Sequence, residues 1–289
     1  MKKLFFFISI TSLSVSCKKD AALWQVQNLN GNKISAFGHG GMGIAFKYPI
    51  DTYESFEPCL RIGAAGTEMD VQISKDSVLV LYHHQKLEDG TSCDGILASK
   101  KWPEMQNCVH ACPYSTSVNL ITATELFDKI NNKDELIFTF DCKLYNSGQS
   151  NTNYRSIYAN TLIKHINNYN IKTNSFIESS DTSFLRMLQN KEPELKLFFY
   201  TGNYTDGLAV SKKIKLFGIT IDHNYITQEE ITNAHSNNLR VTLFNMQTEK
   251  QNMDAIQKNP DFMQSDKIIH LLKIFGEYKE QPIKKKFKW

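Results

Sequence analysis

Three short stretches of the chain, residues 37–41, 67–71 and 81–84, carry polar side chains that a purely structural strand would not contain. The first contributes His39 and the third His83, and the two lie on either side of an acidic pair in the second. Imidazole titrates near neutral pH, so a histidine can give or take a proton under ordinary conditions. These two histidines are therefore the expected general acid and base of one site.

The acidic pair lies on a predicted strand. Glu68 and Asp70 are two residues apart, and side chains at i and i+2 of a strand point to the same face. Two converging carboxylates repel each other, and a hard divalent cation relieves that repulsion because it prefers oxygen ligands. Asp141 and Lys143 repeat the spacing on a later strand and add a third carboxylate and a fixed cation. One divalent cation, Ca²⁺ or Mg²⁺, is expected on Glu68, Asp70 and Asp141.

This ordered set of motifs resembles the glycerophosphodiester phosphodiesterases, a family of phosphoinositide-phospholipase-C-like barrels. That family has a His-Arg-Gly after its first strand, a Pro-Glu-Asn-Thr-like helix start, a Glu-x-Asp strand, a Thr-Lys-Asp-Gly turn and a His-Asp. The corresponding stretches here, in the same order and with fitting spacing, are His39-Gly40-Gly41, Pro49-Ile50-Asp51-Thr52, Glu68-Met69-Asp70, Ser74-Lys75-Asp76-Ser77 and His83-His84. Weaker likeness continues through residues 140–143, 174–176, 241–244 and 264–266.

The resemblance implies metal-dependent hydrolysis of glycerophosphodiesters to glycerol phosphate and an alcohol. His39 would act as general base and His83 as general acid in an in-line displacement. The attacking group would be water or a neighbouring glycerol hydroxyl, and the second route passes through a cyclic phosphate. Lys143 would bind the substrate, and Phe244 would be either a wall of the pocket or part of the core.

Some positions depart from the family pattern. Gly40 stands where the family has Arg, which removes a phosphate-binding fork. Asp141 replaces Glu and is one methylene shorter, His84 replaces Asp, and residues 50–51 replace Glu-Asn. The two histidines and the first two metal ligands remain, so catalytic activity is still expected.

Two alternatives stay open. Sphingomyelinase D and phosphoinositide-specific phospholipase C also combine an Asp-x-Lys strand with two histidines, so the substrate could be a phospholipid. A pocket apolar enough for acyl chains would favour that reading. The second alternative is a lipid-tethered barrel that binds a glycan or phospholipid headgroup with little catalysis.

Regularly alternating strands and helices must position these residues. The chain has 289 residues, 41% hydrophobic and 22% charged, which is an ordinary globular composition. Eight strands are predicted, at residues 34–38, 67–73, 136–141, 171–176, 195–200, 215–219, 240–244 and 262–265, with a hairpin-like excursion at 78–82. Strands that alternate with helices favour a parallel sheet, and eight of them favour a closed (βα)₈ TIM barrel. This single α/β domain is expected to span residues 34–276, with the candidate side chains at one rim.

The N-terminus reads as an export signal. Residues 1–16 have a positive start and an apolar run too short for a membrane span. The residues before Cys17 look like a lipobox, so we expect Cys17 to be lipidated, with ordinary signal cleavage nearby as the alternative. Residues 18–33 would then be a tether, and residues 277–289 a basic tail. An exported bacterial lipoprotein held at the membrane by this lipid is expected, and the net charge of +3 gives no reason to expect a nucleic-acid partner.

Export implies an oxidising compartment for the remaining cysteines. Cys93, Cys108 and Cys112 lie in a long loop at about residues 88–117. A disulfide among these three is favoured over a zinc site, because Cys-x-His-x-Cys matches no common structural zinc framework. The loop is expected to be a disulfide-pinned lid at one rim, with structural packing alone as the alternative. Cys59 and Cys142 are expected to be buried thiols.

Overall fold

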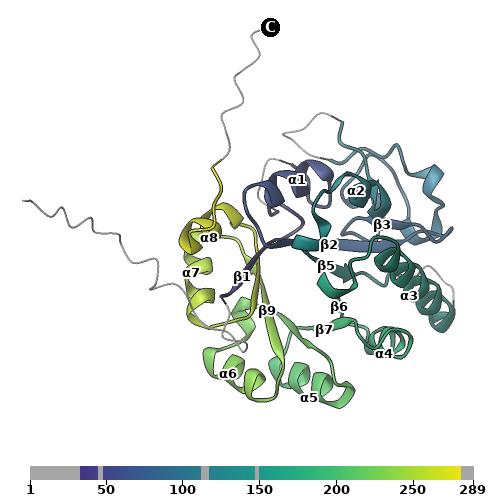
Figure 1. Cartoon of the computed structure of the whole chain (residues 1–289). Coiled ribbons are helices and arrows are strands. Elements are labelled where there is room, and N and C mark those ends of the chain that lie inside the picture. Colours follow the sequence, from purple (N-terminus) through teal and green to yellow (C-terminus); the bar gives the residue numbers. More distant parts are fainter. Residues whose placement is uncertain (1–32, 45–47, 112–116, 147–149, 281–289) are drawn as a thin grey trace, which may run out of the picture.

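A closed barrel of eight parallel strands forms the centre of the molecule (Figure 1). The computed structural model describes residues 33–44, 48–111, 117–146 and 150–280. The barrel strands are β1 (Ser35–Gly38), β2 (Gly66–Ile73), β5 (Ile137–Cys142), β6 (Ser175–Ser179), β7 (Lys196–Thr201), β8 (Gly218–Asp222), β9 (Arg240–Met246) and β10 (Phe262–Ser265). Strand β1 pairs with both β10 and β2, which closes the sheet. The predicted single-domain (βα)₈ barrel is confirmed.

Helices surround the barrel (Figure 1). They are α1 (Tyr53–Arg61), α2 (Ala123–Lys129), α3 (Asn151–Asn168), α4 (Thr182–Lys191), α5 (Tyr204–Ile214), α6 (Gln228–Ser236), α7 (Glu249–Gln257) and α8 (Ile268–Phe275). Six of them begin at a side chain that accepts a backbone N–H of the first turn, namely Thr122, Ser150, Asp181, Asn203, Thr227 and Thr248. Such caps satisfy donors that the helix itself leaves unpaired.

Two predicted strands are displaced along the chain. Strand β6 begins at Ser175 rather than residue 171, because a 3₁₀ turn, Lys172–Asn174, occupies the preceding positions. Strand β8 begins at Gly218 rather than residue 215, because Lys215 adopts a left-handed conformation that ends α5. Both shifts extend the strands toward the rim, so each strand places an additional polar residue there.

The lower part of the barrel interior is an aromatic plug. Its ring centroids lie 4.8–6.1 Å apart, and its members are Phe37, Phe176, Phe198 and Phe262. Side chains two residues further along a strand point to the same face. The positions that follow the plug toward the rim are His39, Glu178, Tyr200 and Gln264. The plug thus supports a polar layer directly above it.

An antiparallel extension lies beside the barrel on the far side of β2. Strand β3 (Leu79–Leu81) pairs with the second half of β2, and β4 (Ile121–Thr122) pairs with β3. The long loop between them contains three 3₁₀ turns, Leu87–Asp89, Leu97–Ser99 and Trp102–Glu104. Its apolar side chains form a small core against β3, made of Val80, Tyr82, Leu87, Leu97, Met105, Cys108 and Leu120.

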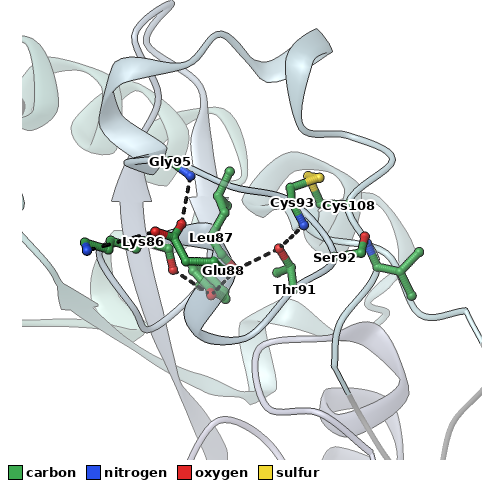
Figure 2. Close-up of a disulfide and its surroundings, with 10 residues drawn as sticks. Lys86, Leu87, Glu88, Thr91, Ser92, Cys93, Gly95 and Cys108 are labelled. Carbon is green, nitrogen blue, oxygen red and sulfur yellow. Dashed lines mark hydrogen bonds and ion pairs between the residues drawn. A yellow bond between two sulfur atoms is a disulfide. The ribbon is translucent and has the colours of Figure 1, made fainter.

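A disulfide closes this loop (Figure 2). It joins Cys93 to Cys108, whose Cα atoms are 5.5 Å apart. The prediction of a disulfide among the cysteines of this loop is confirmed. Around it, the Thr91 hydroxyl accepts the Cys93 N–H and donates to the Leu87 carbonyl (Figure 2). Cys112 lies outside the described residues. Cys59 and Cys142 are buried and unpaired with other cysteines, as predicted.

The chain ends extend beyond the described residues. Residues 1–32, with the predicted signal, Cys17 and most of the tether, are not among them, and neither are residues 281–289 of the predicted tail. Residues 277–280 belong to the fold, because Tyr278 packs against the core and the Lys279 N–H donates to the Ile62 carbonyl at 2.8 Å. None of the helices in the described ranges has the length and apolar content to cross a membrane.

Candidate active site

The three predicted metal ligands meet where the middle of β2 lies beside the carboxyl end of β5. Asp70 and Asp141 are register partners on these neighbouring strands. One ligand atom from each of Glu68, Asp70 and Asp141 lies within 4.8 Å of the other two. Glu68 and Asp70 are 2% exposed, while the Asp141 side chain is 13% exposed. The structure therefore brings together all three carboxylates that the spacing singled out.

The oxygen atoms of this trio fit a hard divalent cation. Within the described residues, Glu68 Oε1 and Asp70 Oδ2 are buried and have no hydrogen-bond partner. Burial raises the pKa of Glu68 well above its usual range, and the charges of Asp70, Asp51 and Asp141 add to the effect. A cation with a preference for oxygen ligands would satisfy these atoms and relieve the repulsion.

Lys143 already neutralises part of this charge. Its Nζ lies 2.7 Å from Asp141 Oδ2 and 3.0 Å from Asp70 Oδ1. Burial opposes the charged ammonium, but the two carboxylates outweigh it and raise the pKa of Lys143. The pKa of Asp70 is correspondingly lowered, because Lys143, His83 and His39 together overcome the effect of burial. Lys143 is thus a permanent cation beside the proposed ion.

Asp51 is a fourth buried carboxyl that the sequence analysis did not place in the site. Its Oδ1 accepts the backbone N–H of Asp70 at 2.9 Å, and its Oδ2 is buried without a partner in the described residues. Burial, followed by the charge of Asp70, raises the pKa of Asp51 well above its usual range. Its φ of 61° is a left-handed conformation that Asp and Asn tolerate better than most residues. Asp51 therefore holds the strand that carries Asp70 and adds potential negative charge.

His39 follows β1 and forms a pair with a carboxylate. Its Nδ1 lies 2.8 Å from Asp266 Oδ1, which also accepts the Ile44 N–H at 3.1 Å. Burial lowers the pKa of His39, but the hydrogen bond and charge of Asp266 outweigh it, so the pKa is raised. With Nδ1 directed at Asp266, Nε2 is the nitrogen that can exchange a proton with a substrate.

His83 is held over the same site by β2. The Asp70 carbonyl accepts the N–H of Tyr82, and the Gln72 amide donates to the carbonyls of Tyr82 and His84 at 2.6 and 2.8 Å. These bonds clamp the residues on both sides of His83. Its half-buried ring has a lowered pKa, chiefly because of desolvation. Gln72 is a positioning residue that the sequence analysis did not identify.

Phe244 stands at the wall of the site. Its ring centroid is 6.3 Å from that of His39 and 5.2 Å from that of Tyr200, and its side chain is half-buried. In the polar layer above the aromatic plug, Glu178 accepts hydrogen bonds from Thr220 and Gln264 at 2.7 and 2.8 Å. Burial raises the pKa of Glu178 to about 8. The floor of the site thus holds a carboxyl group that is largely neutral at pH 7.

The structure explains why position 40 lacks the arginine of the family pattern. Gly40 has φ of 57°, and a Cβ there would lie 2.5 Å from Cβ of Ile50. A non-glycine residue would meet both this contact and a backbone strain of about 1–3 kcal/mol. The Gly40 N–H instead donates to Glu68 Oε2 at 2.8 Å. The two departures at Gly40 and Ile50 are therefore spatially linked.

A polar cavity of about 660 Å³ opens beside His83. Its walls include Asp141 and Lys143 from the site and extend to Arg155 and the start of α4. Among the described residues, none from the long loop at 88–117 lines this cavity. The described residues of the loop pack on β3 with their apolar side chains. The expected lid stays a prediction.

The fold is thus a (βα)₈ barrel that carries two histidines, a lysine and a buried carboxylate cluster at one rim. The profile of the glycerophosphoryl diester phosphodiesterase family matches residues 42–270. The chain belongs to this family, and it is thereby a phosphoric diester hydrolase.

Individual relatives agree with this assignment. A glycerophosphodiester phosphodiesterase from Bacillus altitudinis is 22% identical over 82% of this chain and 97% of its own length. A glycerophosphoryl diester phosphodiesterase structure from Parabacteroides distasonis has a TM-score of 0.67 at 18% identity, covering 91% of this chain and 97% of that one. A phosphodiesterase from Oleispira antarctica, solved with its product sn-glycerol-3-phosphate, has a TM-score of 0.72 at 14% identity, covering 84% and 96%.

Replacing Asp51 by Asn should weaken metal binding. The amide oxygen can still accept the Asp70 N–H, but the carboxyl group is lost, so divalent-ion affinity measured by titration calorimetry should fall about 10- to 100-fold. The metal-free variant should be more stable than the wild type at pH 7, because the wild-type Asp51 must take up a proton to be buried, whereas in the unfolded chain it is ionised. That gain should shrink below pH 4, where the unfolded chain is also protonated.

The exposed Asp134→Asn variant is the control for a general change in charge. Unchanged metal affinity and unchanged urea midpoint in Asp51→Asn would contradict the role given to Asp51.

Replacing Asp266 by Asn should lower the pKa of His39. In the metal-free wild type, NMR titration of the imidazole protons should show His39 titrating above 6.5 and His83 below it. Asp266→Asn removes the charge that raises the first value, so the His39 titration should move to lower pH. A second pair outside the site, His235 and Asp261, provides the control. Asp261→Asn should leave His39 unchanged, and an equal shift in both variants would argue against the pairing.

Proposed function

We propose that the protein hydrolyses glycerophosphodiesters to glycerol phosphate and an alcohol, with a divalent cation bound by Glu68, Asp70 and Asp141. The observation that carries this proposal is that two histidines and a lysine converge on one buried carboxylate. His39, His83 and Lys143 each lower the pKa of Asp70. A phosphodiester requires neutralisation of its oxygens together with proton transfer, and this arrangement supplies both.

His39 serves as general base in this proposal. Asp266 holds its Nδ1–H, so Nε2 takes the proton from water or from a neighbouring glycerol hydroxyl as the new P–O bond forms. The carboxylate then stabilises the imidazolium, as in other His–Asp pairs. His83 serves as general acid and gives its proton to the alcohol oxygen as the second P–O bond breaks. Its lowered pKa makes its protonated form the stronger acid.

Among the side chains of the protein, Lys143 neutralises charge at the phosphoryl oxygens. A bound Ca²⁺ or Mg²⁺ would supply Lewis-acid stabilisation of the same oxygens. The polar walls of the cavity beside His83 favour a water-soluble diester over a phospholipid, because acyl chains need apolar walls. The intact acid, base and carboxylates favour an enzyme over a binding barrel.

We also propose that the protein is exported and tethered by a lipid on Cys17. The disulfide between Cys93 and Cys108 supports this, since disulfides persist mainly in oxidising compartments. Cells fed a labelled fatty acid should incorporate the label into the full chain and not into a Cys17→Ser variant. Equal labelling of both chains, or of neither, would contradict the lipid tether.

Phosphorus NMR tests the hydrolysis directly. The purified chain is incubated with glycerophosphocholine and Ca²⁺, Mg²⁺ or a chelator, and glycerol phosphate should appear only with metal. His39→Ala and His83→Ala should each lower the rate about 10²- to 10⁴-fold, the usual contribution of a positioned acid or base. A cyclic phosphate resonance would identify the glycerol hydroxyl as the attacking group.

His270→Ala is the matched control, because this histidine lies on α8 and its ring contacts Asn252 and Glu249 rather than the carboxylate trio. Turnover that persists in chelator would exclude the metal requirement, and turnover that persists in His39→Ala would exclude the assigned base.

A further inference from the structure

We propose that the cavity beside His83 binds the leaving alcohol and selects a neutral, polyhydroxylated one, such as glycerol, a cyclitol or a sugar, over a quaternary ammonium alcohol. This inference rests on the proposed hydrolysis and names the substrate class of the same site. It starts from the cavity of about 660 Å³ that is lined by His83, Asp141 and Lys143.

The orientation of the substrate follows from which histidine lines the cavity. His83, Asp141 and Lys143 are among its walls, while His39 and Phe244 are not. An ester group that receives its proton from His83 must lie on the His83 side of the phosphorus. The leaving alcohol therefore enters the cavity, and the glycerol moiety stays on the side of His39.

The far wall of the cavity is rich in hydrogen-bonding groups. Arg155 on α3 contacts Asp181 Oδ2 through Nε at 2.7 Å and through a terminal nitrogen at 2.5 Å. Two of the five guanidinium N–H groups serve this pair. The hydroxyls that join it at the start of α4 belong to Ser180, Thr182 and Ser183. Alternating donors and acceptors of this kind match the vicinal hydroxyls of a polyol.

The charges of the walls argue against an anionic headgroup. Lys143 is paired with Asp70 and Asp141, and Arg155 is paired with Asp181. Lys143 also faces the phosphoryl group in the proposed reaction, so little positive charge is left in the wall to attract a second anionic group on the leaving alcohol. A neutral ligand fits this balance best.

Of the two tyrosines in the wall, Tyr200 offers no open ring face to a quaternary ammonium group. Such a group binds over exposed aromatic faces. The Tyr200 ring already has the Lys143 Nζ at 5.9 Å from its centroid and packs against Phe244 at 5.2 Å. A trimethylammonium placed there would meet a like charge instead of an open ring face.

Competing substrates test the selectivity. The full chain with Mg²⁺ or Ca²⁺ should show at least a tenfold higher kcat/KM for glycerophosphoglycerol or glycerophosphoinositol than for glycerophosphocholine, since a site that hydrogen-bonds hydroxyls discriminates strongly against an analogue without them. Arg155→Gln should lower kcat/KM about tenfold for the polyol diesters and less than threefold for glycerophosphocholine. Ser183→Ala, a milder change on the same wall, should act in the same direction.

The exposed Arg186 on α4 does not line the cavity, so Arg186→Gln is the matched control. A wild-type preference for glycerophosphocholine, or an equal loss on both substrates in Arg155→Gln, would overturn the assignment, because a merely structural role of Arg155 affects all substrates alike.

Binding of the free alcohols separates this inference from the proposed function. Saturation-transfer NMR should detect inositol, and not choline, on the wild-type chain, and the signal should be lost in Arg155→Gln. That result would support the subsite even if no diester were hydrolysed, in which case only the proposed reaction would fail. Choline binding as strong as inositol binding, or inositol binding unaffected by Arg155→Gln, would overturn the subsite even in an active enzyme.

Discussion

The barrel rim is organised by the need to hold several carboxylates close together inside the protein. Glu68 and Asp70 are almost fully buried, and their repulsion is only partly relieved by the ammonium of Lys143. Burying such a cluster without compensating charge is expensive. The aromatic plug lies beneath the polar layer, and the carboxylate oxygens that have no hydrogen-bond partner among the described residues indicate where a further cation would be needed. The catalytic proposal follows from this imbalance.

Strand β2 positions two of the three carboxylates and the backbone around His83. Its inward side chains supply Glu68 and Asp70, and the Asp70 carbonyl and the Gln72 amide fix the backbone around His83. The second half of β2 also pairs with β3, which the disulfide-closed loop covers with its own small core. The loop thus packs against the strand that leads to His83, the proposed general acid, although its described residues stay outside the cavity. A structural element remote from the chemistry therefore sets the position of His83.

Much of this arrangement could be predicted from spacing alone. Side chains two residues apart on strands placed Glu68 with Asp70 and Asp141 with Lys143, and the alternation of strands and helices predicted the barrel. Asp51 could not be placed, because its role depends on a left-handed backbone that brings it to Asp70 from outside any strand. The pairing of Asp266 with His39 could not be predicted from the spacing, because it depends on β10 lying next to β1. The predicted boundaries of β6 and β8 were wrong, because a local turn occupies the first positions of each predicted strand.

Three of the departures from the family pattern, at positions 40, 50 and 51, lie together in space. Gly40 and Ile50 share one contact, and Asp51 follows Ile50 in the chain and bonds to the strand that carries Asp70. The guanidinium of the family pattern is absent at position 40, and the carboxyl that the pattern has at position 50 is replaced by one at Asp51. Among the described residues that surround the carboxylate trio, Lys143 is then the permanent cation facing an anionic substrate. The proposed cation would matter more in a site with this charge balance than in one that retains the arginine, because without it the carboxylates would repel an anionic substrate.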